Sequence, residues 1–170
     1  MRALRLLVVA LAGAAACACA SVEPLPLAPS PDPAPSGAPQ PVEGYDWYLG
    51  EEDDALWLGY GLADSDDIWL AMTCLRGSGR MELEQHLDMG PDRAVVLESG
   101  GETERWPARG EYSEMLGGDI LVAQVPTDHP VFLRFRRLGW MAANGQKARV
   151  TMAAHPGSPA RIERFFTACG

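Results

Sequence analysis

DDIWLAMTCLRGSGRMEL, residues Asp66 to Leu83, is the stretch that decides the fold. From Ile68 onward apolar residues alternate as in a β-strand, because successive side chains of a strand point to opposite faces. One face would carry Ile68, Leu70, Met72 and Cys74. Residues 76–79 (RGSG) supply a flexible reversal, and Arg80 begins a second alternating run. The stretch therefore predicts a β-hairpin with Cys74 on its apolar face.

Similar runs, separated by turn residues, continue through the rest of the chain. They predict strands over 55–61, 94–98, 103–107, 119–125, 131–137, 138–143 and 147–153. Asn144-Gly145 is a strong hairpin signal, because a type I′ turn needs positive φ at both central positions. Residues 110–118 are weakly patterned, and we expect a loop there.

One helix is predicted at the end of the sequence. Ser158 suits the N-cap position, and Pro159 suits the first helical position, where its missing N–H costs nothing. An apolar stripe follows at positions i, i+3, i+4 and i+7, made of Ile162, Phe165, Phe166 and Cys169. The fold class expected is all-β, an antiparallel β-sandwich or barrel-like structure, with one C-terminal α-helix.

Two cysteines of the folded part each end an apolar stripe. Cys74 ends the stripe of the first strand, and Cys169 ends that of the helix. In an oxidising compartment an even cysteine count favours a bridge, so a Cys74–Cys169 disulfide is predicted. The alternative is a pair of buried thiols, since free cysteine is often buried.

The first 20 residues have the composition of an export signal. Two arginines precede an apolar core over 6–12, and small residues follow. Ala14-Ala15-Ala16-Cys17 resembles the lipobox of bacterial lipoprotein signals, and this resemblance implies that Cys17 is lipidated.

Other readings of this segment stay open. Ala18-Cys19-Ala20 fits an ordinary secretory cleavage before Ser21, and Cys19 is an alternative lipidation site. Residues 3–22 are also nearly long enough to stay as a membrane anchor. Each reading places the folded part outside the cytoplasm, either lipid-anchored in the periplasm or outer membrane, or secreted in soluble form.

The next segment predicts a tether. Residues 23–41 hold eight prolines among alanine, serine and glycine, a composition that favours extended polyproline conformations over a packed core. The expected organisation is a signal peptide over 1–20, a disordered Pro/Ala-rich tether over 21–44 and a β-rich globular domain over 45–170.

The net charge limits the possible partners. The 170-residue chain carries a formal charge of −9, and removing the first 20 residues, with two arginines and no acid, would make it −11. A domain this acidic is repelled by phosphate backbones, so no nucleic-acid partner is expected.

Few residues point to chemistry. The three histidines, His86, His129 and His155, lie in different segments without zinc-ligand spacing, and no cofactor or metal is predicted. His129, between Asp128 and Pro130, is the best placed for catalysis, and a hydrolase that uses it with nearby acidic residues is the alternative function.

Two tryptophans suggest a ligand face. If the strands over 55–61 and 68–75 pair in simple register, Trp57 and Trp69 share one sheet face and could form a stacking platform for a saccharide or peptide. The alternative is that both are covered by the core.

A second resemblance indicates a class of protein but implies no activity. The pattern YG…DSDDIWLAMTC…GSGR, with a terminal helix ending in cysteine, resembles small exported bacterial proteins. We therefore expect an exported, lipid-anchored, non-enzymatic cell-envelope domain with a binding or structural role. Its expected partners are the membrane, through the lipid, and an envelope protein or saccharide.

Overall fold

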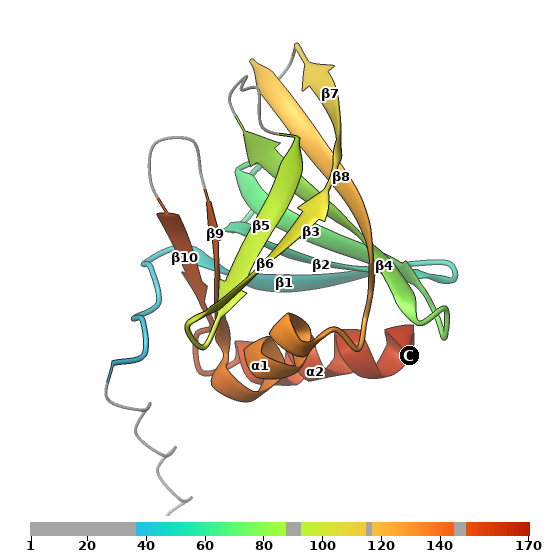
Figure 1. The fold of residues 1–170 in the computed structure, drawn as a ribbon. Coiled ribbons are helices and arrows are strands. Elements are labelled where there is room, and N and C mark those ends of the chain that lie inside the picture. The colour runs from blue at the N-terminus through green and yellow to red at the C-terminus, as the bar shows by residue number, and fades with distance from the viewer. Residues whose placement is uncertain (1–36, 88–92, 115–116, 145–148) are drawn as a thin grey trace, which may run out of the picture. The chain divides into compact units, whose positions relative to one another are not determined.

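The computed structural model describes residues 37–87, 93–114, 117–144 and 149–170. Within these residues the chain forms ten strands in two antiparallel sheets and two helices (Figure 1). The predicted fold class, an antiparallel β structure with a C-terminal helix, is confirmed. The predicted signal peptide, most of the predicted tether and Gly145 of the predicted hairpin turn lie outside the described residues.

The larger sheet has six strands in the order β1-β2-β3-β4-β8-β7. Its strands are β1 (Tyr45–Glu52), β2 (Ala55–Leu62), β3 (Ile68–Leu75), β4 (Arg80–Leu87), β7 (Arg109–Ser113) and β8 (Gly118–Pro126). The hairpin read from Asp66 to Leu83 is thus β3 and β4, in the middle of this sheet. β7 and the start of β8 replace much of the loop expected over 110–118, because Arg109 to Ser113 pair with β8 despite their weak apolar pattern.

The smaller sheet has four strands in the order β10-β9-β5-β6. They are β5 (Ala94–Ser99), β6 (Glu102–Pro107), β9 (Trp140–Asn144) and β10 (Arg149–Ala153). β5 and β6 form one hairpin, and β9 joins them through the pairs Leu97↔Ala143 and Glu98↔Ala142.

The segment predicted as a strand over 131–137 is instead the helix α1 (Pro130–Leu138), and this prediction was wrong. Its buried residues are Val131, Phe132 and Phe135, and Leu133 is 49% exposed. Alternation at 131, 133 and 135 fits a strand, but a short apolar run fits a helix equally well. Pro130 in the first turn favours the helix, since proline suits that position.

The second helix, α2 (Ser158–Cys169), follows the predicted apolar stripe: Ile162, Phe165, Phe166 and Cys169 are all buried. Its N-cap is Gly157 rather than Ser158, and Ser158 uses its hydroxyl elsewhere. At the other end, the N–H groups of Gly77 and Gly79 in the β3–β4 turn bind the carbonyls of Ala168 and Cys169, both at 2.8 Å. The turn therefore satisfies carbonyls that the end of a helix leaves free.

The two helices lie together at one end of the sheets (Figure 1). α2 packs on β1 and β2 of the larger sheet, and α1 packs on β5, β6 and β9 of the smaller one. The shared core contains residues of both sheets and both helices, among them Trp47, Leu58, Leu97, Phe135 and Phe166. Burying this apolar surface is the main favourable term for the fold.

Candidate functional site

The predicted Cys74–Cys169 disulfide is present. The two Cα atoms lie 5.8 Å apart, and the side chains are 3% and 0% exposed. The bond joins β3 to the last turn of α2, next to the turn that caps this helix. A buried bond of this kind holds the helix on the sheet. Cys17 and Cys19, the lipidation candidates, lie outside the described residues.

Trp57 lies on the outer face of the larger sheet and is 38% exposed. Its indole covers two glycines: Gly50, the residue paired with it on β1, and Gly59, two positions further along β2. A Cβ added to Gly50 would lie 1.8 Å from the indole Nε1, and one added to Gly59 would lie 2.6 Å from Cζ3. Only the absence of side chains at both glycines lets the ring lie flat on the sheet.

Trp69 does not share this face, although the simple register expected for these two strands holds from Ala55 to Tyr60, which pair with Leu75 to Leu70. β2 pairs with β3 with a register shift between Tyr60 and Gly61. Beyond the shift, the Trp69 ring packs against Tyr45 at 4.8 Å and against the fully buried Tyr60 at 6.2 Å between centroids. A β-bulge inserts one residue into one strand and thereby changes the direction of the following side chains.

His129 lies just before α1. Its Nε2 is 3.9 Å from Glu104 Oε2, its Nδ1 is buried without a hydrogen-bond partner, and its ring packs edge-on against Trp106 at 5.1 Å. The contact with Glu104 is longer than a hydrogen bond. The described residues thus surround His129 mainly with aromatic rings, and the alternative hydrolase function stays a prediction.

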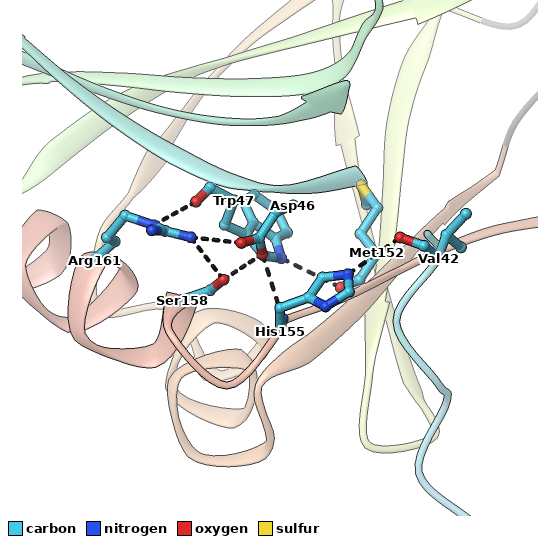
Figure 2. A network of polar contacts seen from close by, with 7 residues as sticks. All are labelled: Val42, Asp46, Trp47, Met152, His155, Ser158 and Arg161. Carbon is cyan, nitrogen blue, oxygen red and sulfur yellow. Dashed lines mark hydrogen bonds and ion pairs between the residues drawn. The ribbon is translucent and has the colours of Figure 1, made fainter. Parts of the chain in front are cut away.

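A denser polar cluster joins β1 to the start of α2 (Figure 2). Asp46 accepts hydrogen bonds from the Ser158 hydroxyl, from the backbone N–H of His155 at 3.3 Å and from Arg161 Nη2 at 2.5 Å. Arg161 Nε also donates to the Trp47 carbonyl at 2.7 Å. Ser158 is fully buried, and the Asp46 side chain is 16% exposed.

This cluster contains a serine, a histidine and an aspartate, but they are not arranged as in a catalytic triad. The Ser158 hydroxyl donates to Asp46, and the His155 ring is turned away, with Nε2 3.2 Å from the Val42 carbonyl (Figure 2). A nucleophilic serine needs a neighbouring base that takes its proton, with that base oriented by the acid. The cluster instead fixes the first turn of α2 to β1.

A cavity of about 160 Å³ lies between the sheets at the side of Trp69. Trp69, Gln85 and His86 come from β3 and β4 of the larger sheet, whereas the remaining lining residues come from β9 and β10 of the smaller one. The latter are Ala143, Val150 and Met152. Trp69 and Val150 are half-buried and lie at the margin of the core, so the cavity joins the core to the surface.

Gln85 is the polar group that sets this cavity apart. Its side chain is 3% exposed, and its Nε2 donates to the Asn144 carbonyl at 2.8 Å, tying β4 to β9. This bond fixes the amide, and its Oε1 is left buried without a hydrogen-bond partner. Buried acceptors without a partner are uncommon and costly, so each one requires an explanation.

Asp67 and Tyr45, which do not line the cavity, hold the Trp69 ring in place. Asp67 accepts a hydrogen bond from Trp69 Nε1 at 2.9 Å and another from the Tyr45 hydroxyl. The Tyr45 bond to Asp67 is the main cause that raises the pKa of Tyr45, with burial and the aspartate charge adding to it. The indole N–H is therefore already paired, and Trp69 offers the cavity an apolar surface.

His86 is the titratable group of the lining. Burial lowers the pKa of its imidazole, and the charges of Glu84 and Asp67 oppose this shift. A half-buried imidazole with a lowered pKa is neutral at pH 7, because its unperturbed pKa is already below that value.

A second depression, of about 340 Å³, lies beside the disulfide. Two of its polar residues already pair with each other: Gln124 Nε2 donates to Glu82 Oε2 at 2.6 Å. Ser78 is also satisfied, since its hydroxyl donates to the Arg80 carbonyl at 2.8 Å. We therefore take the cavity at Gln85 as the candidate functional site.

Sequence reasoning missed Gln85, although the chain holds a signal for it. Among the β4 residues from Arg80 to His86, whose burial is described, the buried ones are Met81, Leu83 and Gln85, so alternation places a glutamine on an apolar face. A polar residue at such a position needs a partner. The residues of β9 and β10 opposite it come from about 60 positions further along the chain, and no local pattern brings them there.

Two negative findings concern the described residues alone. They contain no group of three or more histidine, cysteine, aspartate or glutamate side chains that could hold a metal ion. None of their helices is long and apolar enough to cross a membrane.

Comparison with known proteins found no matching family model, no matching curated protein and no matching solved structure.

Proposed function

We propose that this chain is an exported, lipid-anchored, non-enzymatic protein of the cell envelope whose folded domain binds a small molecule between its two sheets. The export signal, the lipobox-like Cys17 and the Pro-rich segment support the location. The observation that carries the binding role is the cavity of about 160 Å³ between the two sheets, whose lining combines apolar residues such as Trp69, Val150 and Met152 with the polar residues Gln85 and His86. Ligand sites commonly combine apolar walls with a few placed polar groups.

Hydrolysis at His129 has less support. Aromatic rings pack around the imidazole, and the described cluster that resembles a triad, Asp46 with His155 and Ser158, ties a helix to a strand. A binding role requires none of these groups to react.

The binding role is tested by NMR on the full, disulfide-bonded chain with labelled methyl groups. Toluene, phenol, glucose and acetate are titrated separately, because they represent an apolar ring, a ring with a donor, a saccharide and an anion. We expect at least one to shift the Met152, Val150 and Ala143 methyl signals saturably, because these side chains line the cavity.

The control is Ala143→Leu, which should fill the cavity and abolish the shifts while the protein stays folded by circular dichroism. Shifts that persist in this variant, or four ligands that all leave the three methyl signals unchanged, would contradict the proposed site.

A further inference from the structure

We propose that the outer face of the larger sheet binds an uncharged oligosaccharide, with one sugar ring stacked on Trp57 and the following rings over the depression beside the disulfide. This site is separate from the cavity between the sheets, so the inference goes beyond the proposed function and does not depend on it. It follows from the position of the indole, from the strand register that links the indole to the depression, and from the polar residues found there.

Trp57 presents one face of its indole to solvent. Its neighbours along β2, Leu56 and Leu58, are fully buried, whereas Trp57 is 38% exposed. The other face of the ring lies on the sheet, where the absence of side chains at Gly50 and Gly59 makes room for it. The ring is therefore held flat before a ligand arrives, and a ligand would not have to order it. A glucose-type sugar has an apolar face of C–H groups, which packs well on such an aromatic surface.

The strand register joins Trp57 to the depression of about 340 Å³. Trp57 pairs with Thr73, which pairs with Glu82. Glu82 in turn pairs with Gln124 on β8. Residues paired across neighbouring strands point to the same face, so these side chains form one row, and its last three members line the depression. The row crosses three strand spacings, about 14 Å, so a chain of several sugar rings is needed to cover it.

The polar groups of this row suit the hydroxyl groups of a sugar. Gln124 Nε2 donates a hydrogen bond to Glu82 Oε2 at 2.6 Å, which holds the two side chains against each other. A carboxylate has a second oxygen, and a primary amide has a second N–H and a carbonyl oxygen, so this pair still offers acceptors and a donor. Thr73 adds a hydroxyl between the pair and the indole. An apolar surface beside a few placed polar groups is typical of ligand sites.

The charges of this face favour an uncharged ligand. Glu84 lies on the same face as Glu82, because the two are separated by one residue of β4. Arg80 lines the depression. The two carboxylates repel a ligand with acidic groups, and the guanidinium repels one with basic groups. A sugar without charge meets neither repulsion.

A protein partner fits this face less well. Stable protein interfaces bury about 800 Å² on each side and have large apolar or aromatic residues at their centre. Small residues, namely Gly50, Gly59 and Ala71, surround the indole on the paired strands. Leu75, which is 62% exposed, adds one large apolar side chain at the margin of the depression. A single indole on a flat floor has the shape for a sugar ring and offers little to a protein.

The test uses cellotetraose and maltotetraose, two uncharged glucose oligomers of different shape, with glucose and tetragalacturonic acid for comparison. Binding to the full, disulfide-bonded chain is followed by NMR, through the Trp57 indole N–H signal and the Thr73 methyl signal. We expect at least one of the two tetramers to shift both signals saturably. It should bind roughly tenfold or more tightly than glucose, because glucose cannot reach the polar end of the row, and more tightly than the acidic tetramer.

The key variant is Trp57→Ala, which removes the stacking surface and should lower the affinity for that tetramer roughly tenfold or more. Trp57→Phe keeps a smaller ring and should lose less. The matched control is Tyr112→Ala, because Tyr112 is also an exposed aromatic residue of the larger sheet. Tyr112 pairs with the buried Asp119, so it lies on the opposite face, and its loss should leave the affinity unchanged.

Gln124→Ala tests the direction of the sugar chain along the row. Gln124 is exposed, so we expect this variant to fold, and each variant is first shown to be folded by its NMR spectrum. The affinity for the tetramer should fall roughly threefold to tenfold, because a hydrogen bond is lost. The Trp57 signal should still shift at saturation, because the stacking surface is intact. An unchanged affinity would overturn the placement of the chain over Gln124.

Other results would overturn the inference. They are signals that neither tetramer shifts, an affinity that survives in Trp57→Ala, or equal affinity for the acidic tetramer. Tetramethylammonium probes for a cation on the indole, and shifts caused by it but by neither tetramer would contradict a sugar ligand. A Trp57 signal that changes with protein concentration, without ligand, would assign the face to a second copy of the chain. The Met152 methyl signal, which reports on the cavity, should stay unchanged throughout, so failure here and failure of the proposed function are distinguishable.

Discussion

The sulfur atoms of Cys74 and Cys169 are bonded, with their Cα atoms 5.8 Å apart, although the residues are 95 positions apart in the sequence. The bond joins the central hairpin of the larger sheet to the end of α2, beside the backbone bonds from Gly77 and Gly79 that cap the helix. One end of α2 is therefore fixed by a covalent bond and a cap, and the other end by the Asp46 cluster.

Replacing both cysteines by serine should lower the free energy of unfolding by about 2–5 kcal/mol, because the bond closes a long loop in the unfolded chain. Denaturant unfolding of oxidised and variant protein measures this difference, and wild type under reducing conditions is the control. Two reactive thiols mapped to Cys74 and Cys169 in oxidised, denatured protein would rule out the bond.

The Asp46→Ala substitution should lower the free energy of unfolding by about 1–3 kcal/mol, since the Ser158 hydroxyl and the His155 N–H lose their acceptor. Glu163→Ala is the matched control on the same helix. Its pair with Arg136 is on the surface, with Glu163 54% exposed, and should contribute less than about 1 kcal/mol. Equal losses of stability in the two variants would contradict the role of the Asp46 cluster in holding α2 on β1.

The His86 imidazole should titrate below 6.5, because burial disfavours its charged form. A pKa lowered in the folded state means that the unfolded chain binds the proton more readily. Stability should therefore fall as the pH decreases below about 6.5, and the loss is complete below the folded-state pKa. An NMR titration of the ring measures the pKa, and the His86→Asn variant should lack this part of the pH dependence. A pKa at or above 6.5 would contradict the buried position.

Trp57 should be quenched by acrylamide more readily than the fully buried Trp47, as judged by the fluorescence lost in Trp57→Phe. Gly59→Ala should increase this quenching, because the new Cβ would displace the indole from the sheet. Gly157→Ala is the control, since a Cβ there meets nothing within 4 Å. If this outer face is a saccharide platform, an oligosaccharide that stacks on Trp57 should protect it from quencher. An unchanged signal would limit ligand binding to the cavity.

Cys17 should be the first residue of the mature chain and should carry diacylglycerol. Mass spectrometry of the amino-terminal peptide from protein expressed with its own signal measures this. Cys17→Ala should release the protein from the membrane, with Cys19→Ala as the control for the neighbouring cysteine. A free amino terminus at Ser21 would make the protein soluble and remove the anchor from the proposed function.

The sequence alone determined the β class, most of the strands and the C-terminal helix. These are local properties, since the apolar period of 2 in residues such as Ile68 to Cys74, or the helical spacing of Ile162 to Cys169, records which face is buried. It also determined the disulfide partners, because both cysteines end apolar stripes. α1 was missed because its short run carries both patterns: Val131, Leu133 and Phe135 alternate as in a strand, whereas Val131, Phe132 and Phe135 follow the helical spacing and are the residues buried.

Only the tertiary structure decided the candidate site. The register shift at Tyr60 and Gly61 separates Trp69 from Trp57, and no residue pattern marked it. The cavity joins Gln85 on β4 to Ala143 and Val150 on β9 and β10. Within the described residues no strand pairing joins the two sheets, and packing across the core brings them together. Each contact in such a core depends on its neighbours. The unpaired oxygen of Gln85 is a result of that packing, so the sequence could mark the residue as inward-facing but could not show what it faces.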